Sequence, residues 1–149
     1  MKQDLVKDWM THDVITIAPE TTLPEAHRLM ADYQIRRLPV LEGDHIVGIV
    51  TLGDIRGAEA SDATSLSIWE LNYLLSRLRI DKIMTRHPIV ISQEATIDEA
   101  AQMMLDNKIS VLPVVDYHGK LVGIITESDI FRIVVQAWRT EPDAEMAPV

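Results

Sequence analysis

Two short stretches of the sequence carry a hydroxyl and a carboxylate at the same spacing, Thr51 with Asp54 and Thr126 with Asp129. A carboxylate can accept hydrogen bonds from two hydroxyl groups at once, which suits a ligand that presents a diol. The same two side chains can also close the first turn of a helix, with Thr as the N-cap and Asp as a short substitute for the Glu of a capping box. The residue types therefore fit a ligand site or a plain helix cap, and the two roles can coexist.

The residues around these stretches are repeated as well. Each stretch follows an apolar run, so that Gly48–Ile55 reads GIVTLGDI and Gly123–Ile130 reads GIITESDI. Further upstream, Met-Thr and Leu-Pro-Val each occur twice at matched spacing; they begin at Met10, Met84, Leu38 and Leu112. Two such repeats are too few for a solenoid, so we expect each to cover the other's apolar face about a pseudo-twofold axis.

Each repeat predicts the order strand–helix–strand–strand–helix. Runs rich in β-branched residues at Val14–Ile17 and Ile89–Ser92 predict the first strands. A Thr followed three residues later by Glu, at Thr22 and at Thr96, predicts a capping box at the start of the next helix. The Pro in each Leu-Pro-Val predicts an edge strand or a strand start. Each Thr-x-x-Asp then lies where the third strand ends and a helix begins, which is where ligands tend to bind in α/β layouts.

The segment between the repeats predicts a loop followed by one more helix. Leu66–Leu78 is helical by propensity and apolar around much of its girth, so we expect it to be buried against the core or against another subunit. We therefore divide the chain into a first repeat (residues 1–60), a connecting loop and apolar helix (61–78), a second repeat (79–138) and a flexible tail (139–149).

The composition argues against several kinds of function. The formal net charge of −9 disfavours sequence-independent binding of nucleic acid and docking on an anionic membrane. The absence of cysteine excludes a disulfide, a thiolate nucleophile and a cysteine zinc site, and the five histidines lack the spacing of metal ligands. The charged N-terminal segment is not a signal peptide, and no apolar run approaches the roughly 20 residues of a membrane helix. We expect a soluble, cytoplasmic protein with no metal and no catalytic cofactor.

The doubled set of Met-Thr, Leu-Pro-Val and Gly-Ile-x-Thr-x-x-Asp resembles a tandem pair of cystathionine-β-synthase-type (CBS) domains, a Bateman module, from about Leu5 to Ala137. The resemblance implies an α+β (α/β) fold of two β-α-β-β-α repeats that leaves two clefts. It implies that these clefts bind an adenosine compound such as AMP, ADP, ATP or S-adenosylmethionine as a regulatory ligand. It further implies a sensor rather than an enzyme, which forms a homodimer and passes its signal to an effector protein.

The resemblance also assigns roles to matching residues. Asp54 and Asp129 would bind the ribose hydroxyls, with Thr51 and Thr126 beside them. In the family, the adenine slot of one unit generally faces the Thr-x-x-Asp of the other. The positions that match this slot are Ile15, Thr16, Ile35, Ile89, Val90 and Ile109. Packing in the hydrophobic core is the alternative role for these six side chains.

Basic residues directly before Leu-Pro-Val reach the phosphates in the family, and here the two repeats differ. The first repeat has Arg36 and Arg37, whereas the second has Ser110 and Val111. A cleft that uses the arginines would accept phosphates, and one that depends on Ser110 and Val111 would suit adenosine, S-adenosylmethionine or no ligand. The alternative is a solvated arginine that pairs with a nearby carboxylate, Glu42 or Asp32.

A second function remains open from the sequence. The protein could be an interaction scaffold with vestigial clefts, in which the helix around Trp69, Tyr73 and Leu74 docks a partner chain. A hydrolase is disfavoured because nothing in the sequence places a nucleophile beside a general base.

Overall fold

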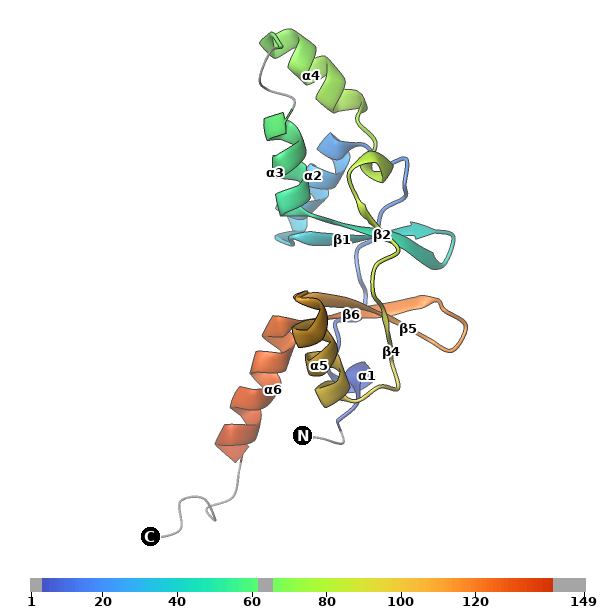
Figure 1. Cartoon of the computed structure of the whole chain (residues 1–149), viewed down its shortest axis with the longest axis vertical. Coiled ribbons are helices and arrows are strands. Elements are labelled where there is room, and N and C mark those ends of the chain that lie inside the picture. Colours follow the sequence, from blue (N-terminus) through green and yellow to red (C-terminus); the bar gives the residue numbers. More distant parts are fainter. Residues whose placement is uncertain (1–3, 62–65, 141–149) are drawn as a thin grey trace. The chain divides into compact units, whose positions relative to one another are not determined.

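A computed structural model describes residues 4–61 and 66–140, which belong to two compact units (Figure 1). The central unit spans Ile15–Pro88, and the terminal unit joins the segment that ends at Val14 to the segment that begins at Ile89. The Met-Thr pair that opens each sequence repeat therefore packs with the strands of the other repeat. The terminal unit holds Met10, and the central unit holds Met84.

The central unit is a three-stranded antiparallel sheet with its main helices on one face. Its sheet has the order β1-β2-β3, and α2 and α3 lie together on the same side of β1 and β2 (Figure 1). Its elements are α2 (Leu23–Tyr33), β1 (Arg37–Glu42), β2 (His45–Thr51), α3 (Leu52–Ser61), α4 (Ile68–Arg77), a short 3-10 helix (Ile80–Lys82) and β3 (Thr85–Arg86). Leu38, Val50 and Ile55 are fully buried between this sheet and the helices.

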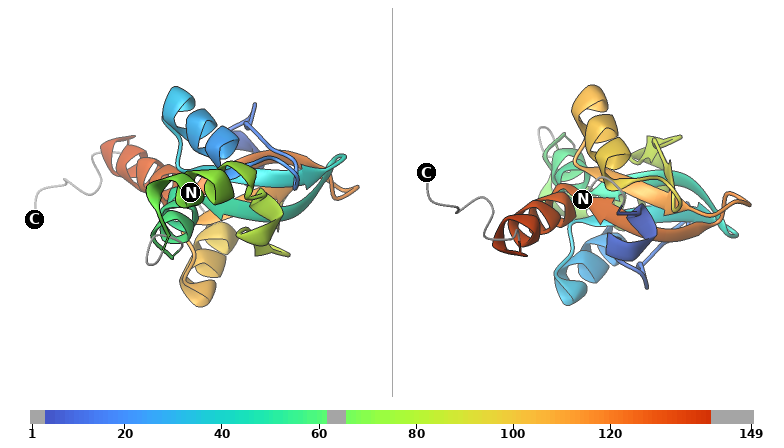
Figure 2. Two further views of the ribbon diagram at one scale, coloured as in Figure 1. Left: turned by 90° about the horizontal axis from the view of Figure 1, so that it is seen from above. Right: turned by 90° about the horizontal axis from the view of Figure 1, so that it is seen from below.

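The terminal unit repeats the hairpin and its helices. Its sheet has the order β4-β5-β6, in which β4 is parallel to β5 and β6 is antiparallel to it. Its elements are α1 (Val6–Trp9), β4 (Ile91–Ser92), α5 (Ile97–Asn107), β5 (Val111–Val115), β6 (Leu121–Thr126) and α6 (Glu127–Thr140). Figure 2 shows α5 and α6 leaving this sheet in different directions. The core of the unit includes Leu112, Ile125 and Ile133.

The first strands are much shorter than the sequence predicts. Of Val14–Ile17, only Ile17 makes a β-bridge, to Val40, so the prediction of a strand over that range is wrong. Two backbone hydrogen bonds hold it, from Ile17 N to the Pro39 carbonyl and from Leu41 N to the Ile17 carbonyl. The equivalent β4 has two residues. The left-handed φ of +43° at Asp13 interrupts extended backbone just before the run, so high β-propensity produces only a brief edge contact.

The two strand prolines are accommodated differently. Pro39 lies in β1, at the edge of its named sheet, and its carbonyl faces Ile17, so its missing N–H removes no bond from the β1–β2 ladder. Pro113 lies within β5, the middle strand, where the prediction of an edge or a strand start is wrong. It is tolerated because β4 pairs only with Val114 and Val115, beyond the proline.

Of the two predicted capping boxes, only the one at Thr96 forms the hydrogen bond from the helix backbone to the Thr side chain. Thr96 Oγ1 accepts a hydrogen bond from Glu99 N at 3.4 Å, as the sequence predicts. Thr22 makes no side-chain cap bond, although helix α2 begins just after it. The Leu78 carbonyl instead accepts a bond from Leu23 N, so a backbone group of the interrepeat segment satisfies this helix start.

Helix α4 forms as predicted, but no part of it is buried in its own unit. Ser67 Oγ caps it by accepting a bond from Glu70 N. None of its residues is buried; Trp69 is 80% exposed and Tyr73 is 58% exposed. The expectation that α4 is buried against the core is therefore wrong for most of the helix, and only Leu75, which is partly buried, packs against that core.

The repeated Met and Gly residues are partners in packing. The side chain of Met84 lies over Gly48 of β2, and the side chain of Met10 lies over Gly123 of β6. A Cβ atom at either glycine would stand 2.9 Å from the Cγ of its methionine, which is closer than carbon atoms normally pack. The Gly that precedes each Thr-x-x-Asp therefore makes room for the opening segment of the other repeat.

Candidate functional site

In the central unit, Thr51 and Asp54 form a reciprocal capping box where β2 ends and α3 begins. Thr51 N donates to Asp54 Oδ2 at 2.9 Å, and Asp54 N donates to Thr51 Oγ1 at 3.1 Å. The structure therefore confirms the helix-cap role that the sequence predicted for these two residues. These bonds engage only one carboxylate oxygen, so the cap leaves Oδ1 outside the pair.

In the terminal unit, Thr126 and Asp129 lie at the equivalent junction of β6 and α6, but their hydrogen bonds differ. Thr126 N donates to Asp129 Oδ2 at 2.9 Å, and Thr126 Oγ1 donates to the same oxygen at 3.2 Å. Asp129 is 8% exposed, and it is the one charged residue in the described part of the chain that is buried.

Asp129 also has a cationic partner that the sequence analysis missed. Arg132 Nη1 donates to Asp129 Oδ1 at 2.7 Å, while the Arg132 side chain itself is 70% exposed. Gly57 holds the matching position of α3, so the central unit has no side chain there to make such a pair. The signal was the spacing of three residues on a predicted helix, at which opposite charges become neighbours.

Sheet register brings the basic pair of the first repeat to the central junction. Arg37 at the start of β1 is the direct partner of Thr51 at the end of β2, and the Arg36 carbonyl accepts a bond from Leu52 N at 2.8 Å. Arg36 is exposed, and Arg37 is half-buried. The sequence left open that a solvated arginine pairs with Glu42 or Asp32. Among residues 4–61 and 66–140, no ion pair joins Arg36 to either of these carboxylates.

The same register places uncharged residues at the terminal junction. Val111 is the direct partner of Thr126, and the Ser110 carbonyl accepts a bond from Glu127 N at 3.0 Å. The two units therefore share the backbone arrangement of a Thr-x-x-Asp beside the residues before Leu-Pro-Val. They differ in the charge that those residues carry.

The six predicted adenine-slot residues are divided between the units, and none of them is fully buried. Ile15 and Ile35 lie at the margin of the central core, and Ile109 lies at the margin of the terminal core. Ile89 is 39% exposed. Thr16 and Val90 are half-buried. Core packing accounts for part of the surface of these side chains and leaves the remainder accessible to a ligand.

The described residues contain neither a metal-binding cluster nor a membrane-spanning helix. No group of three or more His, Asp or Glu side chains within residues 4–61 and 66–140 is arranged to hold a metal ion. No helix in these same ranges combines the length and the apolar character needed to cross a bilayer.

Comparison with known sequences gives two matches to one family model, that of the CBS domain, over residues 6–61 and 80–136. An inosine-5′-monophosphate dehydrogenase of Korarchaeum cryptofilum is 38% identical over 125 residues, which cover 84% of this chain and 23% of that protein. A CBS domain-containing protein of Dictyostelium discoideum is 31% identical over 139 residues, which cover 93% of this chain and 96% of that protein. The chain spans only 21–47% of the length of the first few curated relatives it matches.

Solved structures give similar matches. CBSX2 of Arabidopsis thaliana in complex with AMP superposes with a TM-score of 0.76 at 27% identity, over 91% of this chain and 99% of that chain. A CBS domain pair in complex with 5′-methylthioadenosine and S-adenosyl-L-methionine superposes with a TM-score of 0.75 at 31% identity, over 89% of this chain and 96% of that chain.

Proposed function

The chain belongs to the CBS domain family, and from this membership we propose that it is a regulatory module that binds adenosine-containing ligands. AMP, ADP, ATP and S-adenosylmethionine are the candidate ligands. Two structural relatives support this choice, since one was solved with AMP and the other with 5′-methylthioadenosine and S-adenosyl-L-methionine. The proposed activity is binding, without catalysis.

The observation that carries the proposal is the fixed position of one carboxylate at each strand–helix junction. Thr51 N and Thr126 N each donate to an Asp Oδ2 at 2.9 Å, which orients Asp54 and Asp129 in the same way. An oriented carboxylate accepts hydrogen bonds from the two hydroxyl groups of a ribose and loses less side-chain entropy than a mobile carboxylate would. The adenine would pack on the accessible parts of the slot residues named above.

The arginines next to the central junction support binding of a phosphorylated ligand. Arg36 is exposed and lies directly before β1, and its carbonyl accepts a hydrogen bond from Leu52 N, the residue after β2. A guanidinium can donate two parallel hydrogen bonds to a phosphate, which gives orientation as well as charge. The terminal unit has Ser110 and Val111 in these places, so we propose two unequal sites.

Regulation would follow from a difference in ligand affinity between two conformations of the protein. A ligand shifts such an equilibrium only by its differential affinity, and a partner that prefers one conformation then responds to the ligand. We propose that this protein is a homodimer that signals to an effector protein in this way. No binding of nucleic acid or membrane forms part of the proposal.

Thermal unfolding with adenosine, AMP, ATP and S-adenosylmethionine tests the proposed function. A ligand at 100 times its dissociation constant should stabilise the folded protein by about 2.7 kcal/mol. Asp54→Asn and Asp129→Asn should each remove binding at one site, because the amide keeps one oxygen acceptor for the Thr N–H but replaces the other with a donor. Asp32→Asn, at an exposed position of α2, is the matched control. A melting temperature that none of the four compounds raises would contradict the proposal.

The exposure of α4 favours a second candidate, a protein-interaction scaffold. Ile68, Trp69, Tyr73 and Leu74 are all large, apolar and exposed. An exposed apolar helix face is typical of a surface that another protein covers. A pulldown separates the two functions, because capture by a scaffold should ignore nucleotides and survive both Asp→Asn substitutions.

A further inference from the structure

We propose that Arg132 is a latch on Asp129, which a ribose diol must displace in order to bind in the terminal unit. This inference deepens the proposed function and rests on it, because it concerns the carboxylate assigned there to ribose. It adds a residue that sets the affinity and the salt dependence of that site.

The latch follows from a count of hydrogen-bond acceptor positions. A carboxylate offers about four lone pairs, two on each oxygen. Asp129 Oδ2 already accepts bonds from Thr126 N and Thr126 Oγ1, and Oδ1 accepts one from Arg132 Nη1. One lone pair is left, whereas a ribose diol donates two hydrogen bonds. One of the three existing bonds must therefore open before both hydroxyl groups can bind.

Arg132 is the partner that gives way most easily. The Thr126 N–H belongs to the backbone at the end of β6, directly before α6, and the Thr126 hydroxyl donates from the same residue. The guanidinium of Arg132 sits on a side chain that is 70% exposed. Water can therefore replace the guanidinium at its exposed end, whereas the part-buried Thr126 N–H would lose its acceptor.

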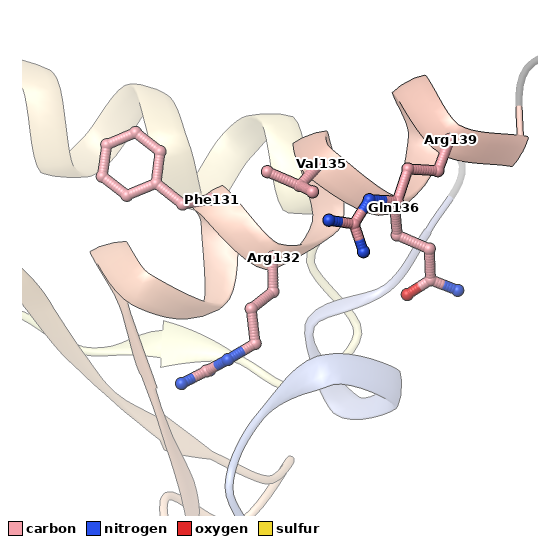
Figure 3. Close-up of a pocket in the computed structure, with 5 residues that line it drawn as sticks. All are labelled: Phe131, Arg132, Val135, Gln136 and Arg139. Atoms are coloured by element: carbon pink, nitrogen blue, oxygen red, sulfur yellow. The ribbon is translucent and has the colours of Figure 1, made fainter.

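The surface beside Arg132 has room for the displaced side chain. A shallow pocket of about 520 Å³ lies on α6 and is lined by Phe131, Arg132, Val135, Gln136 and Arg139 (Figure 3). Gln136 lies one helical turn beyond Arg132, so its side-chain carbonyl can accept the hydrogen bond that Arg132 loses at Asp129. The open conformation of the latch therefore needs no movement of the backbone.

The latch predicts an unusual effect of salt on the affinity for a neutral ligand. Salt screens the attraction between an exposed Arg132 and Asp129 and thereby favours the open latch. Adenosine carries no charge, so its own attraction to the protein is little affected by salt. Binding of adenosine at the Asp129 site should therefore become tighter as the salt concentration rises, which is opposite to the behaviour of a phosphorylated ligand.

Calorimetric titration of adenosine into the full chain carrying Asp54→Asn tests the latch, because Asp129 is then the remaining ribose carboxylate. Adding Arg132→Met, which removes the donor, should tighten adenosine binding by up to about fivefold, which corresponds to about 1 kcal/mol, and should abolish the tightening by salt. Arg139→Met, on the same helix and in the same pocket, is the matched control and should change neither quantity. With 2′-deoxyadenosine, which needs only the one remaining lone pair, Arg132→Met should bring no gain.

The outcomes separate failure of the latch from failure of the proposed function. If Arg132→Met leaves adenosine affinity and its salt dependence unchanged while Asp129→Asn abolishes binding, the latch is wrong and the ribose role of Asp129 stands. If Arg132→Met weakens adenosine binding, Arg132 contacts the ligand directly and the latch is again wrong. If adenosine binds neither to the wild-type protein nor to any variant, both the latch and the adenosine site are wrong.

Discussion

The carbonyl oxygen of Thr11 lies 2.8 Å from the place that a Cβ atom would take at Gly123. The backbone of the N-terminal segment therefore lies directly against β6, next to the side chain of Met10. At the equivalent glycine of the central unit, Gly48, the nearest three atoms all belong to the Met84 side chain. The two glycines occupy the same place in the repeat, but only at Gly123 is one of the three nearest atoms a backbone atom.

Gly123→Ala should destabilise the protein more than Gly48→Ala. A flexible methionine can turn away from a new methyl group, whereas the Thr11 carbonyl accepts a hydrogen bond from Ile124 N and can move only with its backbone segment. We expect Gly123→Ala to lower the free energy of unfolding by about 1–3 kcal/mol and Gly48→Ala to lower it less. Urea unfolding midpoints measure the difference. Gly57→Ala in α3, where the space around the new methyl group is open, should be neutral or slightly stabilising. Equal losses at Gly48 and Gly123 would contradict this account.

Arg36→Ala should weaken binding of AMP and ATP by about tenfold or more and leave adenosine binding unchanged. The reason is that a charge-assisted hydrogen bond to phosphate contributes about 1.5–3 kcal/mol, and adenosine has no phosphate to receive it. Calorimetric titration with the three compounds measures the effect. Arg28→Ala, at an exposed position of α2, is the control for a change in net charge alone. An identical loss for adenosine and AMP would show that Arg36 acts on the fold or on another part of the ligand.

Trp69→Ser should change the oligomeric state or partner binding without changing stability. Trp69 is 80% exposed, so its removal should alter the free energy of unfolding of a single chain by no more than about 0.5 kcal/mol. If α4 packs against a second copy, light scattering should detect a smaller mass for Trp69→Ser. Leu105→Ser, on α5 and 73% exposed, is the matched control. A dimer that persists in Trp69→Ser would place the interface away from this helix.

Asp116 should titrate below the ordinary range of an aspartate. The backbone N–H of Lys120 donates to its Oδ1 at 3.0 Å and is the main reason for the lowered pKa, and the N–H of His118 donates to the same oxygen at 2.8 Å. Because the folded pKa is lower than the unfolded pKa, the ionised Asp116 stabilises the fold above the unfolded pKa. That stabilisation is lost as pH falls through the folded pKa. NMR titration of the carboxyl carbon measures the shift, and Asp116→Asn should remove this contribution to the acid sensitivity. An ordinary pKa would show that the turn is open in solution.

Local hydrogen bonding is the part of the structure that the sequence determined. Thr51 pairs with Asp54, and Thr126 pairs with Asp129, within four-residue stretches, so their geometry depends little on the rest of the chain. The repeated order of strands and helices was predicted for the same reason, since β-branched runs and capping residues are local signals. Assignment of these carboxylates to ribose stays a prediction.

Tertiary structure decided which surfaces are covered. The apolar pattern of Leu66–Leu78 predicted burial, but no residue of α4 is buried, and Leu75 is the one residue of this helix that packs against the central core. Val14–Ile17 has the residues of a strand, yet only Ile17 finds a partner. Contact between Met10 and Gly123 joins residues far apart in the sequence. Burial and long-range pairing depend on which elements meet, and that choice is made by the free energy of the whole folded chain rather than by any one segment.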